Sequence, residues 1–173
     1  SLLFYLIITV ILFSKEGNSQ CSIQSLWKDD FNIPSYSGNA YEFQVAQNGD
    51  VYVLLIDEYH QYQLSVRKFS GGNWSYVGSP GFTTNFGGTY ADIDLDLDGN
   101  DVPFVSYTAN TSKSYVQMFN GTSWVLVGGG SISASNSFNV SLTIDNTNKP
   151  CVFFSDATVS VKGSAKRFDG TNW

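Results

Sequence analysis

Three near-copies of one phrase recur along the chain: Phe69-Ser-Gly-Gly-Asn-Trp74, Phe119-Asn-Gly-Thr-Ser-Trp124 and Phe168-Asp-Gly-Thr-Asn-Trp173. Counting Trp27 as well, successive tryptophans are 47, 50 and 49 residues apart. A period of this length indicates a repeat architecture, in which each unit buries its apolar surface by stacking on a neighbouring copy. The spacing therefore predicts a repeat protein phased by its four tryptophans.

A second segment aligns across the repeats without gaps, over residues 41–55, 93–107 and 140–154. In each copy apolar and polar residues alternate. In the first copy Tyr41, Phe43 and Val45 are the apolar residues, and a polar residue stands between each of them and the next. This period of two predicts a strand with one apolar face, and the following Asn-, Gly- and Asp-rich stretch predicts a turn into a second strand. The aromatic phrase then joins a third strand to a fourth.

We therefore predict an all-β fold, a β-propeller fragment of about three four-stranded antiparallel blades. No helix is expected beyond residues 1–19.

The third strand ending in an aromatic residue, the polar turn with glycine and the Trp that opens the fourth strand resemble the hairpin of kelch-type propellers. The resemblance spans about residues 27–173. Kelch repeats close their second strand with a Gly-Gly pair, whereas this chain has Ile56-Asp57, Thr108-Ala109 and Ser155-Asp156 there. The chain is therefore more similar to the loosely kelch-like propellers of secreted bacterial surface proteins. Because a propeller closes with roughly four to eight blades, we expect the chain to be part of a longer protein.

Residues 2–13 form an uninterrupted run that is apolar except for Thr9. A bilayer-spanning helix needs about twenty residues, so this run suits the core of a signal peptide better. Small residues at Gly17 and Ser19 favour a cut before Gln20. We predict a signal peptide over residues 1–19, truncated at its N-terminus, and a partial propeller over 20–173. The mature chain would be secreted or at the cell surface, with no membrane span; an uncleaved anchor is the alternative.

The net charge is −6, from nine Lys and Arg against fifteen Asp and Glu, without a basic cluster. Phosphate contacts dominate nucleic-acid affinity, so no nucleic-acid partner is expected. Nothing in the sequence implies an oligomer. A Cys21–Cys151 disulfide is conceivable in an exported chain, but Cys151 aligns with Tyr52 and Phe104, which favours a small core residue there.

The acidic run from Asp92 to Asp101 allows two interpretations. Asp94, Asp96 and Asp98, followed by Gly99, resemble the start of a calcium loop. The closing Glu of such a loop is absent, because Val105 stands at its position. The repeat alignment favours the other interpretation, in which this is the polar face of a first strand. Calcium is the only cofactor that the sequence suggests.

Binding residues are expected in the loops that vary between copies, because the recurring Trp and Phe residues are better explained by packing between blades. The loop between the second and third strands contains Asp57, Glu58, Tyr59, His60 and Tyr62. The loop between repeats adds Phe82, Asn85 and Phe86, which we expect to be exposed. His60 is the only histidine and lies beside no serine or cysteine nucleophile motif.

The favoured hypothesis is an exported, non-catalytic propeller that binds a glycan or a protein partner. One alternative is a propeller glycosidase or other hydrolase, which needs two or three converging carboxylates partly supplied by missing blades. No catalytic residue is identified here. A structural surface repeat is the third hypothesis.

Overall fold

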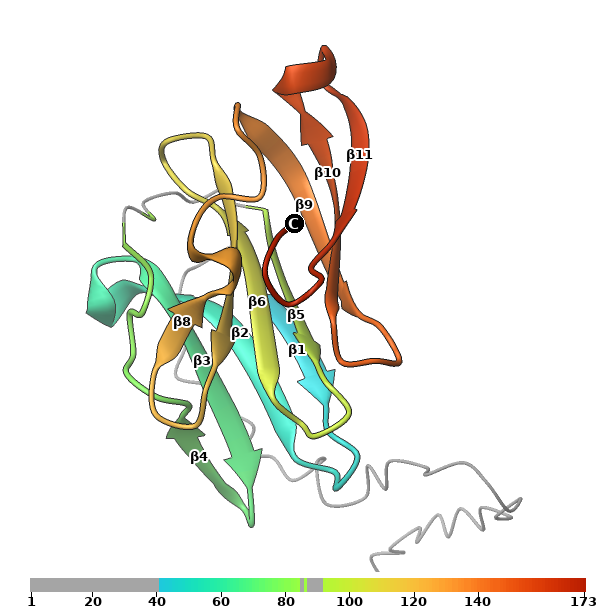
Figure 1. The fold of residues 1–173 in the computed structure, drawn as a ribbon. Coiled ribbons are helices and arrows are strands. Elements are labelled where there is room, and N and C mark those ends of the chain that lie inside the picture. Colours follow the sequence, from blue (N-terminus) through green and yellow to red (C-terminus); the bar gives the residue numbers. More distant parts are fainter. Residues whose placement is uncertain (1–40, 85, 87–91) are drawn as a thin grey trace, which may run out of the picture.

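The computed structural model describes residues 41–84, 86 and 92–173, which form an all-β fold of three antiparallel sheets (Figure 1). The first sheet contains four strands, β1 (Tyr41–Val45), β2 (Val51–Asp57), β3 (Gln63–Ser70) and β4 (Asn73–Tyr76). The second also contains four, β5 (Ile93–Leu97), β6 (Pro103–Thr108), β7 (Ser114–Phe119) and β8 (Trp124–Leu126). The third contains three, β9 (Ser137–Ile144), β10 (Pro150–Asp156) and β11 (Lys162–Arg167). Trp27, Cys21 and the predicted signal peptide lie outside the described residues.

The first hairpin of each sheet has the same register. Phe43 pairs with Val53, Leu95 with Val105, and Leu142 with Val152. These pairs are the ones that the gapless alignment of the three segments predicts, and a slip of one residue would turn every apolar side chain to the other face. The alignment is therefore confirmed at the level of individual residue pairs.

The recurring aromatic phrase forms the same pair of rings in all three copies. Phe69 and Trp74 lie 5.2 Å apart at 52°, and Phe119 and Trp124 lie 5.7 Å apart at 51°. The third pair, Phe168 with Trp173, has 5.5 Å and 50°. Trp74 and Trp124 also pair directly with the last aromatic residue of the preceding strand in their hairpins. The prediction that they occupy equivalent places is confirmed.

Two hydrophobic cores lie between the sheets. The core between the first and second sheets includes Leu54, Leu95 and Val105, with Trp124 packed against it. The core between the second and third sheets includes Phe104 and Phe154, with Trp173 and Phe168 packed against it. Trp124 and Trp173 thus stabilise the contacts between sheets, as expected of a residue that recurs in stacked repeats.

The first strands of the three sheets are neighbours, since β1 contacts β5 and β5 contacts β9 (Figure 1). Within the described residues, the connections contain three short 3-10 turns, η2 (Glu58–His60), η3 (Val127–Gly129) and η4 (Ala157–Val159). The expectation of no helix after residue 19 is therefore wrong in detail. η2 and η4 form because the residue before each, Asp57 or Asp156, accepts a hydrogen bond from the backbone two residues later.

Candidate functional site

Asp57 organises the loop between β2 and β3. Its side chain is fully buried. One carboxylate oxygen accepts the amide of Tyr59 at 3.1 Å, and the other accepts the hydroxyls of Ser65 at 2.8 Å and Tyr76 at 3.1 Å. Nδ1 of His60 lies 2.9 Å from this second oxygen. Ser65 and His60 thus contact one carboxylate rather than each other, which differs from the nucleophile–base–acid order of a catalytic triad.

Burial alone would raise the pKa of Asp57, since it disfavours the charged form. The hydrogen bonds from His60, Ser65 and Tyr76, together with the charge of His60, outweigh burial and leave the pKa of Asp57 below its ordinary value. The carboxylate is therefore ionised at neutral pH, and its role in this geometry is to hold the loop.

The same loop presents two tyrosines to solvent. Gln61 and Tyr62 follow η2 with φ of 59° and 57°, in the left-handed region that non-glycine residues rarely adopt. The side chains of Tyr59 and Tyr62 are 71% and 52% exposed. Such residues persist where the surrounding structure holds them, and here the amide of Tyr62 donates to the carbonyl of Asp57 at 2.9 Å. The structure thus places Tyr59 and Tyr62 together at an exposed loop tip.

The third sheet has a loop of the same construction. Asp156 accepts the amide of Thr158 and the hydroxyl of Ser133, each at 2.9 Å. Ser160 and Val161 then take φ of 61° and 60°. Here valine occupies the position of Tyr62, so the backbone is repeated while the exposed side chain differs.

The loop after β4 does not expose its aromatic rings as expected. Phe86 is 2% exposed and meets Tyr107 edge-on at 6.1 Å, and Phe82 stacks on Trp124 at 4.2 Å. The expectation that these rings are exposed is wrong for Phe86, and Phe82 is partly buried. The physical reason is that the chain doubles back onto β3, where the amide of Phe82 bonds the carbonyl of Leu64 at 3.0 Å. Asn85 lies outside the described residues.

Acidic side chains on β5, and that of Asp92 just before it, contact the edge strand of the third sheet. The side chain of Asp92 accepts the amide of Asn139 at 2.5 Å. Those of Asp94 and Asp96 accept the amides of Leu142 and Ile144, each at 2.7 Å. β9 is an outer strand of its sheet, so these carboxylates satisfy edge amides that would otherwise lack a strand partner.

Asp98 accepts the amides of Asn100 at 2.8 Å and Val102 at 2.9 Å and so closes the β5–β6 turn. Among the residues that the structure describes, no three His, Cys, Asp or Glu side chains are grouped as a metal site requires. Cation binding by Asp94, Asp96 and Asp98 stays a prediction, and a bound cation would compete with the backbone amides for these carboxylates.

A cleft between the first and second sheets was not predicted. Its volume is about 590 Å³, within the range of small-ligand sites. Lys68, paired with Asp50 at 2.7 Å, lines it together with Tyr52 on one side, and Phe119 and Asp101 line the other. The hydrogen bond to Asp50 raises the pKa of Lys68. Because the two walls come from different repeats, the local sequence pattern gave no signal for the cleft.

No family model matches the chain, and no curated protein matches it. Among solved structures it is similar to a fucose lectin from Kordia zhangzhouensis in complex with methyl-fucoside. The identity is 13% and the TM-score 0.47, over 78% of this chain and 95% of the lectin chain. Similarity at this level assigns no ligand to the chain. In the described part of the chain, none of the helices has the length and apolar character needed to cross a membrane.

Proposed function

We propose that the chain is a non-catalytic binding module whose ligand is a glycan, bound at the loop of Tyr59 and Tyr62. The observation that carries the proposal is the exposure of these two rings on a loop fixed by buried Asp57. Tyrosine offers a rigid ring face and a hydroxyl at low entropic cost, a combination that favours contact with polar ligands. His60, Glu58 and the backbone of the loop supply neighbouring polar groups.

We also propose that the three sheets are blades of a β-propeller. The adjacency of β1, β5 and β9, and the equivalent aromatic pairs in all three copies, support this architecture. In a propeller, the β2–β3 and β10–β11 loops would lie on one face. The loops of Tyr59 and Val159 would then present a row of variable side chains on an invariant frame.

Export of the chain is part of the same proposal. It rests on the apolar run over residues 2–13 and the small residues before Gln20. N-terminal sequencing of the protein isolated from its own host, from the medium and from the membrane fraction, would test it: a mature chain that begins at Gln20 supports export, and retention of residues 1–19 argues for an anchor.

The cleft between the first two sheets is a second location for the same class of ligand. The observation that favours it is its concave shape, with the rings of Tyr52 and Phe119 beside Lys68 and Asp101. Sugar-binding sites of this kind combine ring faces with a few placed polar groups. Lys68→Ala alters the cleft without touching the loop of Tyr59.

The test is a glycan-array screen of the chain, with methyl-fucoside among the probes, followed by calorimetric titration of each ligand found. We expect Tyr59→Ala together with Tyr62→Ala to weaken binding at least tenfold, about 1.4 kcal/mol, and Lys68→Ala to leave it unchanged. Loss of binding with Lys68→Ala alone would move the site to the cleft. Binding of no glycan at all, or retention of full affinity in the double tyrosine variant and in Lys68→Ala, would overturn the proposal. Circular dichroism of each variant confirms that the fold is kept.

A further inference from the structure

The loops that follow β2, β6 and β10 lie at the same end of the three sheets (Figure 1). They comprise residues 58–62, 109–113 and 157–161. Together with the linker between η3 and β9, residues 130–136, they are here called the loop surface. Tyr59 and Tyr62, the proposed glycan contacts, form the part of this surface that belongs to the first sheet.

Hydrogen bonds hold the linker 130–136 to the loops on both of its sides. The amide of Ser137, where β9 begins, donates to the carbonyl of Ser112 at 2.9 Å. On the other side, the amide of Ala157 donates to the carbonyl of Asn136 at 2.9 Å. The loops of the second and third sheets are therefore parts of one continuous surface.

Phe86 connects the loop of the first sheet to the second sheet. Its carbonyl accepts the side-chain amide of Gln63 at 2.9 Å, and its ring meets Tyr107 on β6 edge-on at 6.1 Å. Gln63 follows Tyr62 directly in the chain. The first loop is therefore held in a fixed place beside the second.

The loop surface is much longer than one sugar ring. Packed sheets lie about 10 Å apart, so the loops of the first and third sheets are separated by roughly 20 Å. Tyr59 is exposed on the first loop, Thr111 on the second and Val161 on the third. A ligand that contacts all three loops must therefore be an extended chain.

The side chains of this surface favour a neutral chain with many hydroxyl groups. Lys113 is the only Lys or Arg in the four segments, and Glu58 on the first loop balances its charge. The buried carboxylates of Asp57 and Asp156 lie at the bases of two loops, so an acidic polymer would face negative charge without a basic cluster. Hydroxyl and amide groups, which both donate and accept hydrogen bonds, are exposed on the second loop, the linker and the third loop. They belong to Asn110, Thr111, Asn136, Thr158 and Ser160.

We propose that the loop surface binds several successive units of one neutral glycan chain, an inference that rests on the proposed glycan-binding function. One unit lies against Tyr59 and Tyr62, and later units meet Thr111 on the second loop and Val161 on the third. Once the first unit is bound, the following units are held at high effective concentration. Affinity therefore rises with chain length until the surface is covered.

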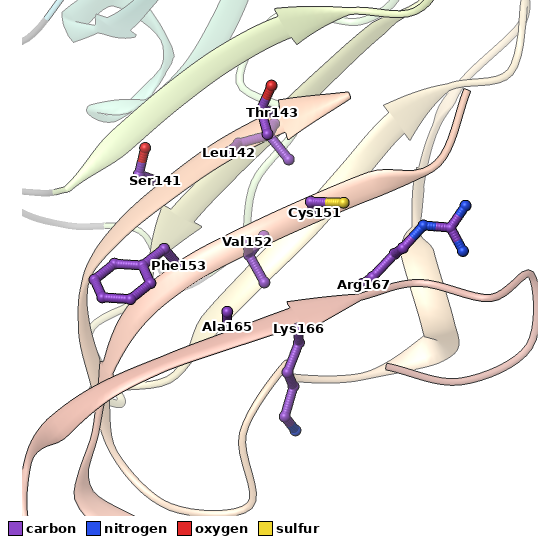
Figure 2. Close-up of a pocket in the computed structure, with 9 residues that line it drawn as sticks. All are labelled: Ser141, Leu142, Thr143, Cys151, Val152, Phe153, Ala165, Lys166 and Arg167. Carbon is purple, nitrogen blue, oxygen red and sulfur yellow. The ribbon is translucent and has the colours of Figure 1, made fainter. Parts of the chain in front are cut away.

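A groove on the third sheet provides a control for this proposal. Its volume is about 370 Å³, and its lining residues lie on β9, β10 and β11, outside the loop surface (Figure 2). Phe153 in this groove is 59% exposed. Phe153→Ala therefore removes an exposed aromatic ring without altering a residue of the loop surface.

The test is calorimetric titration of the full chain with neutral oligomers of glucose, mannose, xylose and fucose, each of one, two, four and six units. The oligomers of any other glycan that the array retains are added to these series. In at least one series we expect the hexamer to bind more than about tenfold tighter than the monosaccharide, above the roughly sixfold gain that six equivalent units give by statistics alone. Thr111→Ala and Val161→Ala should each weaken hexamer binding at least about threefold and leave monosaccharide binding unchanged. Phe153→Ala should change neither.

A hexamer that gains no more than the statistical factor would overturn this inference and leave the proposed function in place, because the monosaccharide still binds. A length gain that either loop variant leaves intact, or that Phe153→Ala abolishes, would put the chain elsewhere and overturn the inference as well. Tighter binding of a glucuronic acid hexamer than of every neutral hexamer would contradict the neutral ligand. Binding of no glycan would overturn both the inference and the proposed function. If circular dichroism shows that Val161→Ala is misfolded, Val159→Ala on the same loop repeats the test.

Discussion

The indole nitrogen of Trp124 donates a hydrogen bond to the carbonyl of Val77, in the preceding sheet, at 2.8 Å. The same ring stacks on Phe82 at 4.2 Å and meets Phe119 at 5.7 Å. One residue thus joins the end of one repeat to the hairpin of the next. Trp173 makes the equivalent hydrogen bond to Val127, so the connection between sheets is a property of the repeat.

Gly78 lies beneath this aromatic pair, and we predict that it cannot be replaced. Its φ is +70°, and a Cβ there would lie 2.7 Å from Phe119 and 3.3 Å from Trp124. Gly121 is the matched control, with φ of +94° and open space around it. Both Ala variants carry the left-handed strain of roughly 1–2 kcal/mol, and Gly78→Ala should lose a further 1–3 kcal/mol, roughly, from overpacking. Denaturant unfolding measures both; equal losses would contradict the close contact.

Asp96 should stabilise the fold through the amide of Ile144. Asp96→Ala leaves that amide without its acceptor and should lower the free energy of unfolding by about 1–3 kcal/mol. Glu42 on β1 is the control, because its side chain is exposed; partial desolvation of the carboxyl group and the charge of Asp94 raise its pKa. Glu42→Ala should change stability by less than about 0.5 kcal/mol. If the two variants unfold at the same denaturant concentration, the edge contact contributes nothing.

Alkaline pH should destabilise the protein through Tyr107. Burial raises the pKa of Tyr107 to about 12 from 10.0, although a hydrogen bond from Gln117 opposes the rise. Between these values the unfolded chain ionises while the folded one stays neutral, so stability is intact below pH 10 and is lost as pH rises toward 12. The loss should reach roughly 2–3 kcal/mol. In Tyr107→Phe the stability curve should fall less over this interval, and an unchanged fall would assign the effect to other groups.

The strands and the aromatic pairs were predictable because their signals are local and recur. Alternation over residues 41–55 sets the register of Phe43 with Val53, and the copies at 93–107 and 140–154 repeat it. The role of Asp94 and Asp96 was not predictable in the same way, because their partners lie 48 residues later on the edge of another sheet.

Burial of Phe86 escaped prediction for a related reason. An aromatic residue in a polar loop suggests exposure. This loop instead packs against β3, where the side-chain amide of Gln63 donates to the carbonyl of Phe86 at 2.9 Å. The left-handed backbone of Tyr62 also has no sequence signal, since glycine or asparagine would be expected there. The variable loop was expected to bind ligand; its left-handed backbone is seen only in the structure.

The central claim is a division among the aromatic residues: Trp124 and Trp173, which recur, pack between sheets, and the exposed tyrosines of the variable loop are the proposed ligand contacts. The most direct measurement compares the free energies of unfolding of Trp124→Ala and Tyr59→Ala in denaturant. Trp124→Ala should lose about 3–5 kcal/mol, and Tyr59→Ala should stay within about 0.5 kcal/mol of the wild type. A nearly neutral Trp124→Ala, or a loss in Tyr59→Ala as large as that predicted for Trp124→Ala, would contradict the account.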